Sequence, residues 1–229
     1  MNLFICLHGI VGGKKGKNGK GGPWDPKTLY EHIYENVIEP NKIYYDNINF
    51  LIHSWSIKQK KEILDYYNPV KYCIEKSETK DRRRSKLLSL YKSIQLCNDL
   101  TNNDVILHTR FDNFYKKHLI LDPSNIKRKK VYIASDDPAW DSNPKKHKGR
   151  ICDYFFFGYG KQFFNSINSE KYIQVDDYIE KSDIKVCRYN QKGDIDNHTI
   201  LRVVLEDFDI IKLKEYKSKI NINTFREKL

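Results

Sequence analysis

The sequence predicts an α/β fold with a mostly parallel central sheet flanked by helices. Three short apolar runs, Leu3 to Leu7, Ile48 to Ile52 and Val105 to Leu107, are typical of strands buried on both faces of such a sheet. Segments with helical spacing alternate with these runs in the first half of the chain, as in parallel sheets. The second half is richer in strand-like runs and less regular. No linker divides the 229 residues, so we expect a single domain.

The helices and strands of the first half are predicted in a regular order. Asp25 and Pro26 indicate a helix start, because an Asp side chain caps free N–H groups and Pro fits the first helical position. The best helical periodicity in the chain comes later, between Ser85 and Asn98. The expected elements are a helix from Asp25 to Pro40, a strand at Ile48 to Ile52, a short helix at residues 57 to 66, a strand at Val70 to Ile74, and a helix from Ser85 to Asn98.

The second half is predicted to contain more strands than helices. The expected strands are Lys117 to Leu121, Lys130 to Ala134, Asp153 to Gly158 and Ile210 to Leu213, and the expected helices are Lys161 to Asn168 and Asp196 to Asp207. Residues 214 to 229 are charged, and we expect them to form a fraying end.

The composition is that of a basic globular protein. Hydrophobic residues make up 39% and charged residues 31% of the chain, which argues against a disordered polypeptide. The 41 Lys and Arg residues exceed the 30 Asp and Glu residues, giving a formal charge of +11 that favours polyanionic partners without choosing among them. Much of the excess lies in the clusters Lys14 to Lys20, Arg82 to Arg84, Lys127 to Lys130 and Lys145 to Lys148, which could also be solvated loops.

The cysteines and the N-terminus indicate a reducing compartment. Five cysteines are odd in number and widely spaced, with no Cys-x-x-Cys pair, which argues against a disulfide framework and against a structural zinc site. The first residues lack the pattern of a signal peptide, and no apolar run approaches the ~20 residues of a membrane span. A cytoplasmic protein is therefore expected, and the sequence leaves its oligomeric state open.

Polar side chains follow the buried strands at the points where the apolar runs stop. Ligands of open α/β sheets bind outside the carboxyl ends of the strands. Arg110 and Asp112 follow one such run, so Asp112 is a candidate ligand for a divalent cation and Arg110 a candidate phosphate ligand. The alternative is a strand-end salt bridge. His53 and Trp55 follow another run, and His53 could equally be a buried histidine with satisfied hydrogen bonds.

A glycine-rich loop follows the first strand. Residues 9 to 22 contain seven of the eleven glycines, which allow close approach of the backbone to a ligand. The loop matches neither the P-loop nor the dinucleotide-binding pattern. We expect nucleotide contacts at His8, Gly9, Gly12 and Gly13, the alternative being a purely flexible loop.

Three arginines precede the predicted helix that starts near Ser85. Cations at a helix N-terminus oppose the helix dipole by ~0.3 to 1 kcal/mol each. An anion beside Arg82, Arg83 and Arg84 would relieve this conflict, and a diphosphate fits the free N–H groups and guanidinium groups. The alternative is a solvated basic turn.

Residues 135 to 141 have the composition of a loop with carboxylates and an aromatic ring. Sugars are held by such groups, so Trp140 is a candidate acceptor contact together with His53 and Trp55. An acidic surface turn is the alternative.

Five segments in this order resemble a group of glycosyltransferases from bacterial surface-polysaccharide clusters and large DNA viruses. The segments are HGIVGG, NFLIHSW, RRRSKLLSLYKS, DVILHTRFDNF and CDYFFFG, which together span most of residues 1 to 160. The resemblance implies a GT-A fold, a nucleotide-diphospho-sugar donor, and a glycan or glycoprotein acceptor. Residues 1–114 would then form the nucleotide-binding half, residues 115–215 the acceptor-side half and residues 216–229 a tail.

The resemblance also implies roles for individual residues. Asp112 would bind Mn²⁺ or Mg²⁺ beside Arg110, and Arg84, Ser85 and Ser89 would match the helix pattern at the nucleotide. The candidate catalytic carboxylates are Asp153 and Asp137. Two features depart from the family pattern. Leu87 and Leu88 replace an aromatic pair, and a complete Asp-x-Asp motif is absent.

Two other classes of function are compatible with the composition. The charge of +11 and the many Tyr and Phe residues would suit a non-catalytic module that binds nucleic acid or another polyanion. No RNA- or DNA-binding signature occurs in the sequence, so no specific nucleic-acid partner is expected. A nuclease or phosphatase using Asp112, Asp136 and Asp137 with two metals is the third class, and no histidine matches the acidic pair.

Overall fold

Seven strands form the central sheet, in the order β3-β2-β1-β4-β7-β6-β8. The computed structural model describes residues 1–11, 25–135, 155–181, 205, 208–217 and 222–224. Of the strands in this part, β7 alone runs antiparallel to its neighbours in the sheet. The strands are β1 Asn2–Gly9, β2 Asn47–Ser54, β3 Lys71–Ile74, β4 Val105–Arg110, β6 Lys130–Ser135, β7 Phe155–Tyr159 and β8 Asp209–Lys217. The predicted α/β class with a mostly parallel sheet is confirmed.

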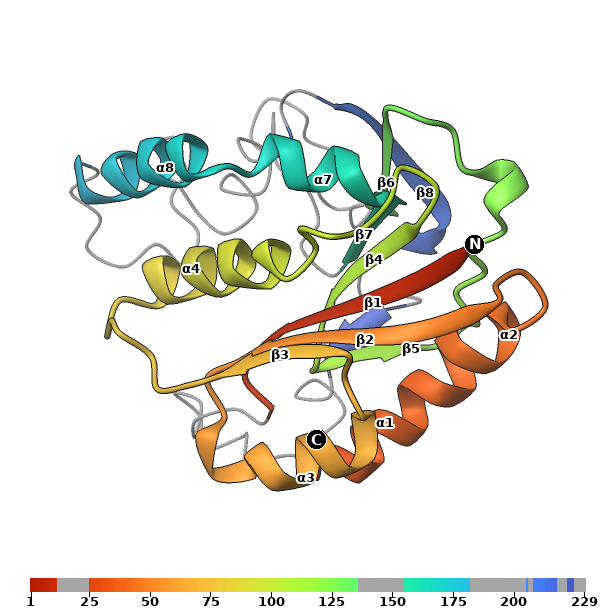
Figure 1. Cartoon of the computed structure of the whole chain (residues 1–229), viewed down its shortest axis with the longest axis horizontal. Coiled ribbons are helices and arrows are strands. Elements are labelled where there is room, and N and C mark those ends of the chain that lie inside the picture. The colour runs from red at the N-terminus through yellow and green to blue at the C-terminus, as the bar shows by residue number, and fades with distance from the viewer. Residues whose placement is uncertain (12–24, 136–154, 182–204, 206–207, 218–221, 225–229) are drawn as a thin grey trace.

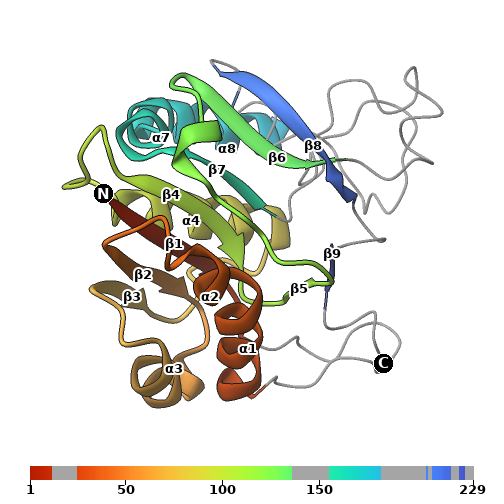
Figure 2. The ribbon, with the colours of Figure 1, turned by 90° about the vertical axis from the view of Figure 1, so that its right-hand side faces the viewer.

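Helices cover both faces of the sheet, as Figures 1 and 2 show. The face of α1, α2 and α3 is opposite to the face of α4, α7 and α8. The helical segments are α1 Pro26–Ile33, the π-helical turn η1 Tyr34–Ile38, α2 Glu39–Asn41, the 3₁₀ turn η2 Ile57–Gln59, α3 Lys60–Tyr67, α4 Arg82–Gln95, the 3₁₀ turn η3 Pro123–Asn125, α7 Gly160–Ser166 and α8 Ser169–Lys181. None of these described helices is long and apolar enough to cross a membrane.

Strand β1 shows how the sequence builds two cores. Side chains alternate between the faces of a strand, so Leu3, Ile5 and Leu7 belong to the core under α1 and α3. Cys6 belongs to the second core, under α4. Because both faces are covered, the strand reads as one continuous apolar run.

The registers of the parallel strands bring distant polar residues side by side. His8 at the end of β1 is paired with His53 of β2 and with Arg110 of β4. His53 is in turn paired with Cys73 of β3. The carboxyl ends of these four strands therefore form one edge of the sheet.

The strand predicted at Lys117 to Leu121 is absent. Leu119 and Leu121 are buried, as a strand pattern would require, yet their backbone groups bond to the helical segment instead of a sheet. The Leu119 N–H donates to the Asn36 carbonyl at 2.8 Å, and the buried Asn41 side chain bonds the Leu119 carbonyl and the Leu121 N–H. Asn41 thus satisfies backbone groups that a neighbouring strand would otherwise pair.

The C-terminal prediction was also wrong in part. Strand β8 extends through Lys217, beyond the predicted end at Leu213. Strand β9, Ile222–Thr224, pairs antiparallel with β5, Asn113–Tyr115, and so returns directly beside Asp112. Most of the helix predicted at Asp196 to Asp207 lies outside the described residues.

Candidate functional site

The Gly9 peptide at the end of β1 joins three elements. Its N–H donates to the Ser89 hydroxyl of α4 at 3.1 Å. Its carbonyl accepts the Ser54 hydroxyl at 3.0 Å and the Trp55 N–H at 3.2 Å. Gly9 has φ +100°, a conformation that residues with a side chain rarely adopt. The backbone is thus turned sharply where the sequence predicts nucleotide contact.

Replacing Gly9 by Ala should lower the free energy of unfolding by about 1–2 kcal/mol, the cost of left-handed backbone for an L-residue. No atom lies within 4 Å of an added Cβ, so strain and not a clash is the cause. Urea denaturation measures the change. Ile10→Ala, at the neighbouring exposed position, is the control and should stay within about 0.5 kcal/mol of the parent. A Gly9→Ala protein as stable as the parent would contradict the strain at this turn.

A chain of polar contacts runs from α4 through His53 to β3. The His53 Nδ1 atom lies 2.8 Å from the Ser89 hydroxyl, and its Nε2 atom lies 3.4 Å from Glu75 Oε1. Lys92 donates to Glu75 and to Glu78, at 2.5 Å each. Burial lowers the pKa of His53 to about 4, so the imidazole is neutral at physiological pH. The hydrogen bond from Lys92 lowers the pKa of Glu75.

The predicted acceptor residues His53 and Trp55 lie together against α4. The His53 side chain is completely buried, and both of its ring nitrogens have polar neighbours, in agreement with the alternative of a buried, satisfied histidine. The Trp55 indole N–H donates to the Ser85 carbonyl at 3.2 Å, and the Lys92 ammonium lies 5.5 Å from the Trp55 ring centroid. The part of this pair that is open to a ligand is therefore the half-buried Trp55.

The three predicted arginines form the first turn of α4 instead of preceding it. Asp81 caps this helix, its carboxylate accepting the N–H groups of Arg83 at 2.7 Å and Arg84 at 3.2 Å. The Asp81 carboxylate is thus the negative group at the positive end of the helix dipole. The expectation that these N–H groups are free to bind a diphosphate was wrong for Arg83 and Arg84. The Arg84 guanidinium pairs with Asp176 of α8 at 2.9 Å. The side chain of Arg82 lies outside the described part.

Arg110 and Asp112 form a two-pronged ion pair beyond the end of β4. The Arg110 Nε and Nη2 atoms donate to the two carboxylate oxygens of Asp112 at 2.8 and 2.7 Å. The Asp112 side chain is 5% exposed and that of Arg110 22%. The pair is the strand-end salt bridge that was the alternative to a metal and phosphate site in the sequence analysis.

A second cluster of buried groups lies next to His8. The His8 and His108 rings are 4.5 Å apart, and His108 stacks on Phe156 at 4.6 Å. Ser93 of α4 lies 2.7 Å from His108 Nε2. The sequence analysis did not identify His108 or Ser93. For His108 a signal was available, because it lies two residues after Ile106 in β4 and therefore on the same face of the strand.

Several predicted site residues lie outside the described residues, and their roles stay predictions. They are Gly12, Gly13, Asp137, Trp140 and Asp153.

Comparisons with known proteins give structural likenesses alone. No protein-family model matches the chain, and no curated protein matches it. One similar solved structure is the 2-C-methyl-D-erythritol 4-phosphate cytidylyltransferase of Francisella tularensis, with 11% identity, a TM-score of 0.46, and coverage of 98% of this chain and 94% of that chain. Another is the nucleoside-diphosphate-sugar pyrophosphorylase of Vibrio cholerae RC9, with 12% identity, a TM-score of 0.45, and coverage of 98% and 95%. These likenesses do not assign a function.

Proposed function

We propose that the protein is a glycosyltransferase that moves a sugar from a nucleotide-diphospho-sugar to a glycan or a protein-linked acceptor. The main support for the proposal is that the carboxyl ends of β1, β2 and β4 lie side by side and bring the predicted site residues together. The sharp turn at Gly9, the half-buried Trp55 and the Arg110–Asp112 pair all lie at this edge. Ligands of α/β sheets bind at such an edge.

The chemistry of glycosyl transfer suits these groups. The leaving nucleoside diphosphate gains negative charge in the transition state, and fixed cations that face this charge lower the barrier. In our proposal the Arg110 guanidinium faces the diphosphate, because its planar donor fork matches phosphate oxygens. The basic first turn of α4, with Arg83 and Arg84, would add positive charge at the same edge.

Asp112 is the proposed ligand of Mn²⁺ or Mg²⁺. Carboxylate oxygens are the ligands that these hard cations prefer. Arg110 donates to both carboxylate oxygens, so a move of Arg110 onto the diphosphate would open Asp112 to the cation. The metal would supply further charge for the leaving group.

The other predicted residues complete the proposal. His8 to Gly13, Ser85 and Ser89 would line or position the nucleotide, with Ser89 acting through the Gly9 turn that it holds. Asp137 or Asp153 would serve as the catalytic carboxylate. Trp55 and Trp140 would contact the acceptor, and His53 would hold the Trp55 ring, whose centroid lies 4.4 Å from its own in an edge-on arrangement.

One described basic cluster bears on the polyanion-binding alternative. Within Lys127 to Lys130, the Arg128 guanidinium donates to the Asn102 carbonyl and the Asn103 side chain and lies over the Tyr159 ring. Lys130 pairs with Asp209. A long polyanion that bound this cluster would have to compete with these contacts, as a diphosphate would with the Asp112 contact of Arg110, so the difference between the two classes lies in the strand-end position of Arg110.

Release of free nucleoside diphosphate from UDP-, GDP- and dTDP-sugars, with Mn²⁺ and without acceptor, tests the proposal. We expect slow release from one donor, because many transferases let water replace a missing acceptor, and a faster rate when the correct glycan is added. Chelation of the metal should remove the activity if Asp112 holds the cation. No release from any donor, with or without a panel of glycan acceptors, would contradict the proposed function.

A further inference from the structure

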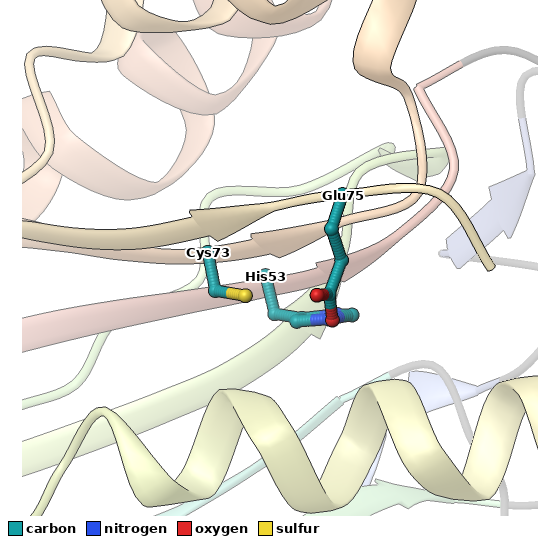
Figure 3. A group of neighbouring side chains, drawn as sticks. All are labelled: His53, Cys73 and Glu75. Atoms are coloured by element: carbon teal, nitrogen blue, oxygen red, sulfur yellow. The ribbon is translucent and has the colours of Figure 1, made fainter. Parts of the chain in front are cut away.

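Three potential metal ligands converge between β2, β3 and α4. His53 and Cys73 are paired in the register of β2 and β3, and Glu75 lies two residues after Cys73. Residues two apart in an extended chain point to the same side. In Figure 3 the three side chains point from their strands toward α4. The closest ligand atoms, one from each side chain, all lie within 4.8 Å of one another.

These separations suit a small tetrahedral ion after minor side-chain movement. Zinc binds nitrogen and oxygen at about 2.0–2.2 Å and sulfur at about 2.3 Å, so neighbouring tetrahedral ligands lie roughly 3.3–3.6 Å apart. The distance from His53 Nε2 to Glu75 Oε1 is 3.4 Å. A lone pair that faces a carboxylate at this distance needs a proton or a cation between the two atoms.

The surroundings of His53 favour the cation. The Ser89 hydroxyl, which accepts the Gly9 N–H, lies 2.8 Å from His53 Nδ1. A proton on Nδ1 would be donated to this hydroxyl, leaving the Nε2 lone pair directed at Glu75. Metal-bound histidines are held in the same way by a partner on the second nitrogen.

The charges of the group also balance a divalent ion. A Cys73 thiolate and the Glu75 carboxylate together offset two positive charges, with His53 neutral. Metal binding would release the thiol proton of Cys73, because the thiolate is the form that ligates a metal. Lys92 contacts Glu78 as well as Glu75, so it keeps one carboxylate partner when Glu75 turns to a metal.

We propose that His53, Cys73 and Glu75 bind a thiophilic divalent metal, with zinc as the best match, in a site separate from Asp112. Zinc binds histidine nitrogen, cysteine sulfur and carboxylate oxygen, whereas Mg²⁺ and Mn²⁺ prefer sites made of oxygen ligands. Three protein ligands leave the fourth tetrahedral position for water or for a substrate atom. This site does not depend on the proposed glycosyl transfer.

Zinc affinity of the purified full-length protein, measured by competition with a chromophoric chelator, tests the site. Cys73→Ser and Glu75→Gln should each weaken zinc binding by about 100-fold or more, beyond the 10–100-fold cost of losing an outer-shell partner. Glu78→Gln is the matched control for Glu75, because Lys92 contacts both carboxylates at 2.5 Å. Cys97→Ser controls for an unrelated thiol, and Asp112→Asn for the other metal site. All three should keep the parent affinity.

Cobalt spectroscopy of the unmodified protein decides the question even if a variant fails to fold. Co²⁺ in the site should give a thiolate-to-metal band in the near ultraviolet and the intense visible bands of tetrahedral coordination. The thiolate band should be missing in Cys73→Ser and present in Cys97→Ser. A weak octahedral spectrum without a thiolate band, or equal zinc affinity in the parent and in Cys73→Ser, would overturn the proposal.

Discussion

Asp112→Asn is expected to lower the turnover of a nucleotide sugar by about 100-fold or more, because a charged metal ligand contributes several kcal/mol to the transition state. The fold should survive. Asparagine keeps the size of the side chain, and the Arg110 guanidinium left behind is partly exposed and can be hydrated. Initial rates at saturating donor and metal, together with circular dichroism, measure the two effects.

Asp99→Asn is the matched control for this experiment. Asp99 also pairs with a basic side chain, that of Lys71, but its own side chain is 76% exposed, and Lys71 begins β3, at the end of the strand away from the proposed site. Its replacement should leave turnover unchanged, since an exposed pair contributes about 0–1 kcal/mol. Parent-like turnover in Asp112→Asn would remove Asp112 from the mechanism and leave the salt bridge as its role.

Arg110→Ala is expected to lower the free energy of unfolding by about 2–4 kcal/mol. The change removes both hydrogen bonds from a guanidinium group to a carboxylate that is 5% exposed. Removing one partner of a buried pair is costly because the other charge remains in a poorly hydrated place. The variant should also bind nucleotide sugar more weakly, since Arg110 is a proposed phosphate ligand.

A double-mutant cycle separates the pair energy from other effects. Arg110→Ala combined with Asp112→Asn should cost less than the sum of the single changes, because the buried carboxylate charge is then absent. Arg128→Ala, which removes an exposed arginine that contacts Asn102 and Asn103, should cost at most about 1 kcal/mol. Additive single costs would mean that Arg110 and Asp112 stabilise the protein independently.

The sequence predicted the central strands well because strands buried on both faces must be continuously apolar. The runs Leu3 to Leu7, Ile48 to Ile52 and Val105 to Leu107 all fall inside β1, β2 and β4. The start of α1 was also predictable, since Asp25 caps it through the Lys27 N–H and Pro26 begins it. These are local signals, which a single segment carries on its own.

The errors concern interactions between distant segments. The alternation of Leu119 and Leu121 is a true burial pattern, yet Asn41 and Asn36, some 80 residues earlier, supply the backbone partners. The return of β9 to β5 likewise depends on residues more than 100 positions apart. Neither partner can be identified from the local pattern.

The candidate sites show the same division. Strand-end positions of His53, Arg110 and Asp112 followed from the apolar runs. The role of Asp81 as the anion at α4 could have been inferred, because Asp before a helix is a strong cap signal. The group of His53, Cys73 and Glu75 could not, since cysteine counting looks for Cys pairs and this group is created by the register of β2 and β3.

The most direct test of the central claim measures two kinds of binding at ~0.15 M salt. Binding of UDP-, GDP-, CMP- and dTDP-sugars is detected as a change in melting temperature, with and without Mn²⁺, and binding of duplex and single-stranded nucleic acid is measured in parallel. A specific ligand stabilises the folded protein by RT ln(1 + [L]/Kd). Nucleic-acid binding through many phosphates falls steeply with salt, whereas one diphosphate releases few counterions. We predict that one nucleotide sugar raises the melting temperature, more so with Mn²⁺, and that nucleic-acid binding is lost at this salt concentration. Sub-micromolar nucleic-acid binding at ~0.15 M salt, with no response to any nucleotide sugar, would contradict the account.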